Sequence, residues 1–272
     1  MKVFVDGVGV LGPGIESWDS YRNLLKNESS YDHSVTPDPM PSILPANECR
    51  RSSDVVRWSL HVAQEAVQQS QIDPKTMATV FASSGGEVGI LHKICQSLES
   101  PTPIVSPTLF HQSVHNAAAG YWSIASSSQR TSTSLACYDS SFAGGLLEAA
   151  TLLSVNQEES ILFVAYDTPA PFPLHETRPL IAPFAIALVL GKQALPKSLS
   201  MLDVSLLSES MDKKPATMLH PSLEPMRLGN PAARGLPLLQ PIAKNLTTSV
   251  YLDFLDNLQL RIDHQPCQPS QK

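Results

Sequence analysis

Short apolar runs alternate with helical patterns along most of this sequence, and that alternation limits the possible folds more than any other feature. Strands are predicted where a short apolar run ends in small or turn-forming residues, and helices where apolar residues recur at helical spacing. The predicted strands are Lys2–Val5, Thr79–Ala82, Ser132–Ala136, Ile161–Val164, Phe184–Leu190, Thr248–Phe254 and Leu258–Ile262. The predicted helices are Ser17–Lys26, Asp54–Gln71, Val88–Leu98, Ser113–Ser123 and Ser141–Leu153. This alternation indicates a layered α/β architecture.

The composition excludes several classes of protein. Hydrophobic residues make up 42% of the chain and charged residues 16%, which is too apolar for a disordered protein. The net charge of -6 would repel a phosphate backbone, so no nucleic-acid partner is expected. The N-terminus does not resemble a signal peptide, and the longest apolar run, Ile181–Leu190, is too short to span a membrane. We expect a soluble cytoplasmic protein with one domain over residues 1–272 and a frayed tail over 265–272.

The cysteines show no metal or disulfide pattern. Cys49, Cys95, Cys137 and Cys267 are scattered without CxxC or Cys/His spacing, so no metal and no disulfide framework are predicted. Cys137 stands out because it lies between a predicted strand and the helix that begins near Ser141. A helix N-terminus lowers the pKa of a thiol and suits a nucleophile. The alternative is a buried, inert cysteine, and no histidine lies in a glycine-rich turn after a strand where it could serve as the base.

A glycine motif near the N-terminus offers another function. Gly7, Gly9 and Gly12 match the GxGxxG dinucleotide fingerprint and follow a predicted strand. A true site would place the helix directly after the glycines, but residues 13–16 intervene, and no strand ending in an acidic residue follows at the expected distance. We therefore expect turn glycines, with a nucleotide-binding oxidoreductase as the alternative and no cofactor in the favoured interpretation.

Two further positions have both a structural and a functional interpretation. Asp139 lies where the helix from Ser141 should begin, so its simplest role is to cap that helix. His115 and Asn116 precede the small residues 117–120, which would let another helix approach closely, either from the same core or from a partner.

The order of these elements resembles the N-terminal half of the β-ketoacyl-ACP synthases of the thiolase-like superfamily. The segments that carry the resemblance are MKVFVDGVGVLGPGIESWDSYRNLL, VFASSGG, SVHNAAAG and STSLACYDSSFAGGLLEAATLL. The phrases SVHNAAAGYWSIA, SFAGGLLEAA, VAYDTPAP and PAARGLPLL are most similar to the short chain length factors of aryl-polyene and related type II polyketide or fatty-acid pathways. The resemblance implies a thiolase-like α-β-α fold with a reduced C-terminal half.

The resemblance also bears on catalysis. An ungapped register from Asn116 to Gly120 on the family's Asn-x-x-Ala-Gly motif puts Asp139 at the position of the catalytic cysteine, and a shift of two residues would restore Cys137. A carboxylate cannot form the acyl thioester that condensation requires. The family's His-Gly-Thr and Gly-His motifs are absent from the sequence. The resemblance therefore implies a subunit without condensing activity of its own, with an acyltransferase or synthase using Cys137 as the alternative.

A chain length factor pairs with a catalytic ketosynthase, as a heterodimer or heterotetramer, and meets the acyl carrier protein through that complex. The resemblance places the partner interface at His115, Asn116, Ala118 and Gly120, within a region from Val105 to Gly120 and the adjoining strand Ser132–Ala136. It also places Leu109 and Phe110 where bulky side chains reach toward the acyl pocket of the partner and limit the length of the acyl chain.

Overall fold

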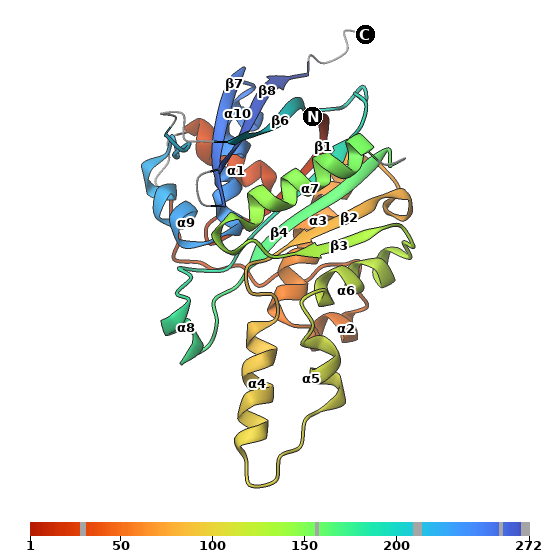
Figure 1. The fold of residues 1–272 in the computed structure, drawn as a ribbon, viewed down its shortest axis with the longest axis vertical. Helices are drawn as coiled ribbons and strands as arrows, with labels where there is room; N and C mark the ends of the chain where they lie inside the picture. Colours follow the sequence, from red (N-terminus) through yellow and green to blue (C-terminus); the bar gives the residue numbers. More distant parts are fainter. Residues whose placement is uncertain (28–30, 156–157, 209–213, 256–257, 268–272) are drawn as a thin grey trace.

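A mixed β-sheet forms the centre of the molecule. The computed structural model describes residues 1–27, 31–155, 158–208, 214–255 and 258–267. Within these ranges the sheet has eight strands in the order β3-β2-β4-β5-β1-β6-β8-β7 (Figure 1). The strands are β1 (Lys2–Leu11), β2 (Ala78–Ala82), β3 (Ser132–Leu135), β4 (Ser160–Asp167), β5 (Phe184–Gly191), β6 (Ser200–Ser208), β7 (Thr248–Phe254) and β8 (Leu258–Pro266). β2 is parallel to β3 and β4, and the remaining neighbours are antiparallel.

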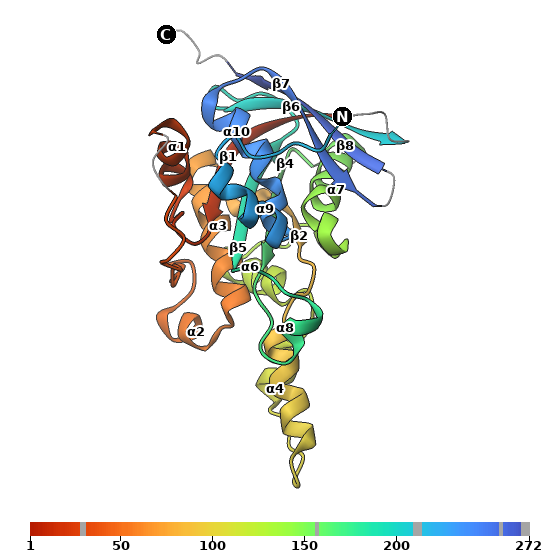
Figure 2. The same cartoon turned by 90° about the vertical axis from the view of Figure 1, so that its left-hand side faces the viewer.

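Helices cover both faces of this sheet. They are α1 (Trp18–Asn27), α2 (Ala46–Arg51), α3 (Asp54–Ser70), α4 (Val88–Glu99), α5 (Pro107–Gln112), α6 (Ala117–Ser126), α7 (Ser141–Val155), α8 (Leu174–Thr177), α9 (Glu224–Gly229) and α10 (Leu236–Lys244). Single 3-10 turns are η1 (Pro74–Thr76), η2 (Tyr138–Ser140), η3 (Pro221–Leu223) and η4 (Ala232–Gly235). α3 and α6 pack on one face, and α7 packs on the other together with η4 (Figures 1 and 2). The predicted α-β-α layering is confirmed.

The central strands are apolar throughout because both of their faces are covered. Every residue of β4 and β5 is buried. Along β4 the side chain of Phe163 enters the core under α7, whereas those of Leu162 and Val164 enter the core under α3. A strand buried on both faces needs a continuous apolar run instead of alternation. The runs predicted at 161–164 and 184–190 are of this kind.

Gly7 and Gly9 are strand residues, which corrects the turn interpretation for these two glycines, whereas Gly12 lies at the turn that it closes with Ile15. β1 continues through Gly7 and Gly9 to Leu11 instead of ending at Val5. A Cβ atom at Gly7 would lie 2.0 Å from the carbonyl oxygen of Ala66, and one at Gly9 would lie 2.1 Å from that of Val62, both on α3. These glycines let α3 lie against the sheet, so no space is left there for a pyrophosphate. The nucleotide-binding alternative is therefore excluded.

One pair of helices projects from the body of the molecule. Residues 88–116, which we call the arm, contain α4, α5 and their connection, and they extend away from the sheet (Figures 1 and 2). α4 agrees with the predicted helix over 88–98. α5 was not predicted, and the helix expected from Ser113 begins only at Ala117.

Beyond β5 the described residues extend the same sheet with β6, β8 and β7, consistent with the predicted reduction of the second half. The pair β7 and β8 was predicted, whereas β6 and α10 were not. The expected frayed tail over 265–272 needs correction at its start, because Gln265 and Pro266 pair with Met201 and Ser200 of β6. Residues 268–272 lie outside the described residues. That residues 1–272 form one domain stays a prediction.

No helix within the described ranges is long and apolar enough to cross a bilayer. The described side chains also contain no group of three or more His, Cys, Asp or Glu residues placed to hold a metal ion.

Candidate functional site

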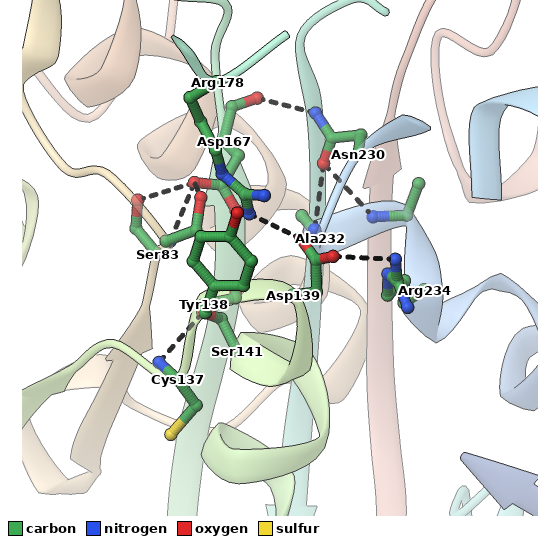
Figure 3. Close-up of polar contacts among 12 residues, drawn as sticks. Ser83, Cys137, Tyr138, Asp139, Ser141, Asp167, Arg178, Asn230, Ala232 and Arg234 are labelled. Carbon is green, nitrogen blue, oxygen red and sulfur yellow. Dashed lines mark hydrogen bonds and ion pairs between the residues drawn. The ribbon is translucent and has the colours of Figure 1, made fainter. Parts of the chain in front are cut away.

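The turns that follow the three parallel strands meet at one edge of the sheet. Ser83 follows β2, Cys137 follows β3 and Asp167 ends β4. The Ser83 hydroxyl donates to Asp167 (Figure 3), and the Ser83 N–H donates to the Leu135 carbonyl two residues before Cys137. In α/β sheets, binding and catalytic groups collect at the carboxyl ends of parallel strands. This edge contains both sequence candidates for the nucleophile position, Cys137 and Asp139.

The turn between β3 and α7 is sharp and carries one residue in the left-handed region. Tyr138 has a φ of 52°, a conformation that costs free energy for a residue other than glycine. The side chain of Ser141 holds the turn: its hydroxyl accepts the Cys137 N–H at 3.1 Å and donates to the Tyr138 carbonyl at 2.7 Å. α/β-hydrolases also hold their nucleophile on a strained strand-to-helix turn. Here the strained residue lies between the two candidates.

The thiol of Cys137 is directed away from Asp139 and into packing with α7 (Figure 3). A Cβ atom at Gly144 would lie 2.7 Å from the Cys137 sulfur and 3.5 Å from the ring of Phe254 on β7. Burial raises the pKa of the Cys137 thiol, so the thiol form is favoured. A nucleophilic cysteine needs the opposite shift. The inert interpretation of Cys137 fits these surroundings better than the nucleophilic one.

Asp139 is held by two arginines. Its Oδ1 pairs with Arg178 at 2.5 Å, and its Oδ2 pairs with Arg234 at 3.1 Å (Figure 3). The guanidinium of Arg178 also lies over the ring of Tyr138, 3.7 Å from its centroid. The expected capping role therefore needs correction, because the carboxylate turns toward guanidinium groups from two distant segments instead of toward the first turn of α7.

A buried carboxyl group that the sequence did not single out lies beside this turn. Oδ1 of Asp167 accepts the hydroxyl of Ser83 at 2.9 Å and both the N–H and the hydroxyl of Ser84 at 2.8 Å. Burial raises the pKa of Asp167 to about 6, and these hydrogen bonds oppose the shift. Asn230 donates to the Asp167 carbonyl at 3.1 Å and to the Ala182 carbonyl at 2.8 Å. The feature of the sequence that could have identified Asp167 is an acidic residue at the end of a buried apolar strand.

The same turns anchor the two ends of the arm. Nε2 of His115 donates to the Ser83 carbonyl at 3.0 Å, at the end of the arm. Glu87 directly precedes the arm and is almost fully buried, and its Oε1 accepts the hydroxyl of Ser53 at 2.5 Å. Burial raises the pKa of Glu87 to about 7. His115, an expected interface residue, is thus partly engaged within its own chain.

The expected interface residues divide between the core and the surface. Ala118 is fully buried in the core beneath α3, so it needs correction as a contact residue for a partner. Asn116 and Gly120 are exposed, and a Cβ atom at Gly120 would meet no other atom within 4 Å. Gly120 and its neighbours Tyr121 and Ile124 border an apolar cavity of about 910 Å³ between α6, α5 and residues 43–48.

The two expected tunnel residues lie on α5 of the arm. Phe110 is 68% exposed and also borders this apolar cavity, whereas Leu109 is half-buried. Phe110 therefore does not fill the core of this chain.

The family of the chain follows from sequence comparison. A family model described as the β-ketoacyl synthase N-terminal domain matches residues 23–227. The chain belongs to the β-ketoacyl synthase family. The matched region contains the turns after β2, β3 and β4, the whole arm and both candidate nucleophile positions. No curated protein matches this family member by sequence.

Solved structures share the fold of this synthase-family chain. One is a "Ketosynthase (ApeO) in Complex with its Chain Length Factor (ApeC) from Xenorhabdus doucetiae", with 23% identity, a TM-score of 0.73 and coverage of 97% of this chain and 99% of that one. "The ishigamide ketosynthase/chain length factor" matches at 10% identity and a TM-score of 0.76, over 98% of this chain and 100% of that one. The type II polyketide complex AntDE:AntF matches at 11% identity and a TM-score of 0.77, over 98% and 99% of the two chains.

Proposed function

We propose that this chain is a non-catalytic chain length factor, which pairs with a catalytically complete β-ketoacyl synthase and lines part of its acyl tunnel. The observation that carries the proposal is the turn after β3, where Asp139 is bound between Arg178 and Arg234. Condensation needs a nucleophile that can carry an acyl group through its covalent intermediate. A carboxylate held by two guanidinium groups is poorly suited to that role, and the Cys137 thiol has a raised pKa.

The surface of the chain supports a partner subunit. β3 lies at one end of the sheet, so one side of its backbone has no neighbouring strand within the described residues. Next to it, α6 presents Gly120 and the 80% exposed Ile124 beside the apolar cavity. Exposed apolar patches on soluble proteins mark interaction sites. The partner we propose is a ketosynthase subunit, in keeping with the complexes named in the matched structures, with acyl carrier protein bound through that complex.

The arm supports a role in chain length. Phe110 projects from α5 instead of filling a core, and Leu109 lies half-buried beside it. In the proposed complex these two side chains reach toward the partner's acyl pocket and close the tunnel. An acyl chain that grows past them meets an overpacking cost of about 1–3 kcal/mol, which favours release over another extension.

The test of this function is a reconstituted pair. The chain is co-expressed with the ketosynthase encoded nearest to it, and the pair is isolated by size-exclusion chromatography and assayed with malonyl-loaded carrier protein. We expect one stable complex, condensing activity in the pair, and none in this chain alone. The chain without its partner should be poorly soluble, because an uncovered apolar surface of interface size favours aggregation.

A cysteine variant separates the proposed function from the acyltransferase alternative. In the pair, Cys137→Ala should leave turnover nearly unchanged, as should the control Cys95→Ala at an exposed position on α4. Deleting a true nucleophile costs on the order of a hundredfold or more. A loss of that size in Cys137→Ala alone would show that this chain catalyses a step through its thiol.

A further inference from the structure

Three segments that are distant in sequence converge on one carboxylate. Asp139 lies in η2, Arg178 directly follows α8, and Arg234 belongs to η4. Each oxygen of Asp139 takes a different arginine, Oδ1 at 2.5 Å and Oδ2 at 3.1 Å. The carboxylate therefore bridges two guanidinium groups, and Figure 3 shows it lying between them.

The charges around this carboxylate leave the arginines incompletely compensated. Two guanidinium groups share one carboxylate, and Nε of Arg234 is buried without a hydrogen-bond partner in the described structure. The adjacent Arg227 is already paired with Glu224 at 2.6 Å. Asp253 also borders the hollow beside Asp139, but within the described residues it forms no ion pair with Arg178 or Arg234. The guanidinium donors are thus placed for an anion, and Asp139 is the anion bound to both.

The geometry is that of a carboxylate receptor. Arginine is the side chain best suited to bind a carboxylate, because its planar donors match the two oxygens. The ring of Tyr138 lies under the guanidinium of Arg178 and orients it. The hollow beside Asp139 has only about 10 Å³ of free space, which is about the volume needed for one water molecule. No external carboxylate fits there while the Asp139 side chain is in place.

We infer that Arg178 and Arg234 form a binding site for small carboxylates and that the chain fills this site with its own Asp139. Removal of the Asp139 carboxylate should open a space of the size and chemistry of formate or acetate. The site holds the turn after β3, the segment after α8 and the element η4 together. This inference does not depend on whether the chain pairs with a synthase.

The experiment is chemical rescue of Asp139→Ala. We expect its melting temperature to fall by about 4 °C, because two neighbouring guanidinium groups lose their shared counter-ion. Sodium formate should restore at least half of that loss, with a half-maximal effect on the order of 10 mM, a weak affinity suited to so small a ligand. Sodium chloride at the same concentration should restore little. The parent protein should show no difference between the two salts, because Asp139 already fills the site.

A double variant shows where the formate binds. In Asp139→Ala combined with Arg234→Gln, formate should no longer differ from chloride. Equal stability of Asp139→Ala and the parent, or an equal effect of formate on both, would overturn the inference. If Asp139→Ala is recovered only as aggregate, the readout becomes refolding yield. For Asp139→Ala the refolding yield in formate must then exceed the yield in chloride. For Phe163→Ala, which is destabilised elsewhere in the chain, the two yields must be equal. Any other pattern contradicts the site.

Discussion

The central strands and the arm use the same kinds of side chain in opposite ways. In β4 and β5 every residue is buried, because α3 and α7 cover both faces of the sheet. On the arm, Ile104 is 77% exposed and Phe110 is 68% exposed. Exposed aromatic and aliphatic groups forgo roughly 1.5–3 kcal/mol each of burial free energy. The central strands of the body bury their apolar side chains within the chain, whereas the arm leaves apolar side chains exposed.

The largest expected effect comes from removing a body phenylalanine. Phe163→Ala should lower the free energy of unfolding by about 3–5 kcal/mol, because Phe163 is fully buried against Phe142 and its truncation leaves a cavity in the core. Phe110→Ala should change it by no more than about 0.5 kcal/mol, as expected for a surface residue. Urea unfolding followed by tryptophan fluorescence measures both values. Similar losses in the two variants would remove the distinction between body and arm.

The outward face of α6 provides the next test, through partner binding. Ile124→Glu should weaken binding of the ketosynthase about 30–100-fold while the chain stays folded, because a charge would be buried in the apolar contact. Val155→Glu is the matched control, since Val155 is 71% exposed at the end of α7. Biolayer interferometry on the purified subunits gives both affinities. Equal affinity of the two variants would place the interface elsewhere.

The junction between body and arm should make stability depend on pH. Burial raises the pKa of Glu87 to about 7, so the folded chain keeps this proton between pH 4.5 and 7 while the unfolded chain has lost it. The stability linked to this proton is therefore present at low pH and lost as pH rises through that window. Glu65 and Asp167 shift in the same direction, with pKa values of about 7 and about 6.

The variant Glu87→Gln isolates this contribution. The free energy of unfolding of the parent minus that of Glu87→Gln should fall by about 1–3 kcal/mol between pH 5 and pH 8. Glu99→Gln, at an exposed carboxyl near the end of α4, is the control for the change in charge. Burial lowers the pKa of His264, so this group makes the folded state more stable as pH rises toward 6.5, the opposite of Glu87. The parent and the variant both contain His264, so its effect cancels in the difference between their free energies of unfolding. A difference that stays constant with pH would contradict the assignment.

The smallest expected effect concerns the product of the reconstituted pair. Phe110→Ala or Leu109→Ala should shift the acyl products toward longer chains by one or more two-carbon units, with early condensations unchanged. The gating cost of about 1 kcal/mol or more corresponds to a several-fold change in product ratio. Leu98→Ala, at an exposed leucine on α4, is the control. Mass spectrometry of the carrier-bound products measures the ratio, and an unaltered profile in both gate variants would end the gating proposal.

Local patterns predicted most of the elements, and the failures have physical reasons. α3 was predicted to within one residue of its observed bounds, and Ser53 caps it by accepting the Val56 N–H. β1 was ended too early, because glycine in a strand looks like a turn unless the packing of α3 is known. β6 was missed because it lies within the proline- and methionine-rich segment from Gly191 to Gly235, in which no clear period was recognised. α5 has only the residues 107–112, too few for a helical period to be recognised.

The sequence likewise predicted one part of the candidate site and missed another. The order of elements and the positions of Cys137 and Asp139 beside a helix start were readable from the sequence. The two arginines that bind Asp139 were not, because Arg178 and Arg234 lie 39 and 95 residues further along the chain. Likewise, residues 117–119 face the core while Gly120 and Ile124 face outward.

The sequence by itself determined the layered α/β fold and the family, because both depend on hydrophobic periodicity and on motifs within short stretches. Only the tertiary structure decided which small and apolar residues serve the core and which remain uncovered, since that depends on where distant helices pack. It also decided the partners of Asp139, because ion pairs depend on distance in space, and no local pattern encodes the approach of η4 and the segment after α8 to the turn at Tyr138.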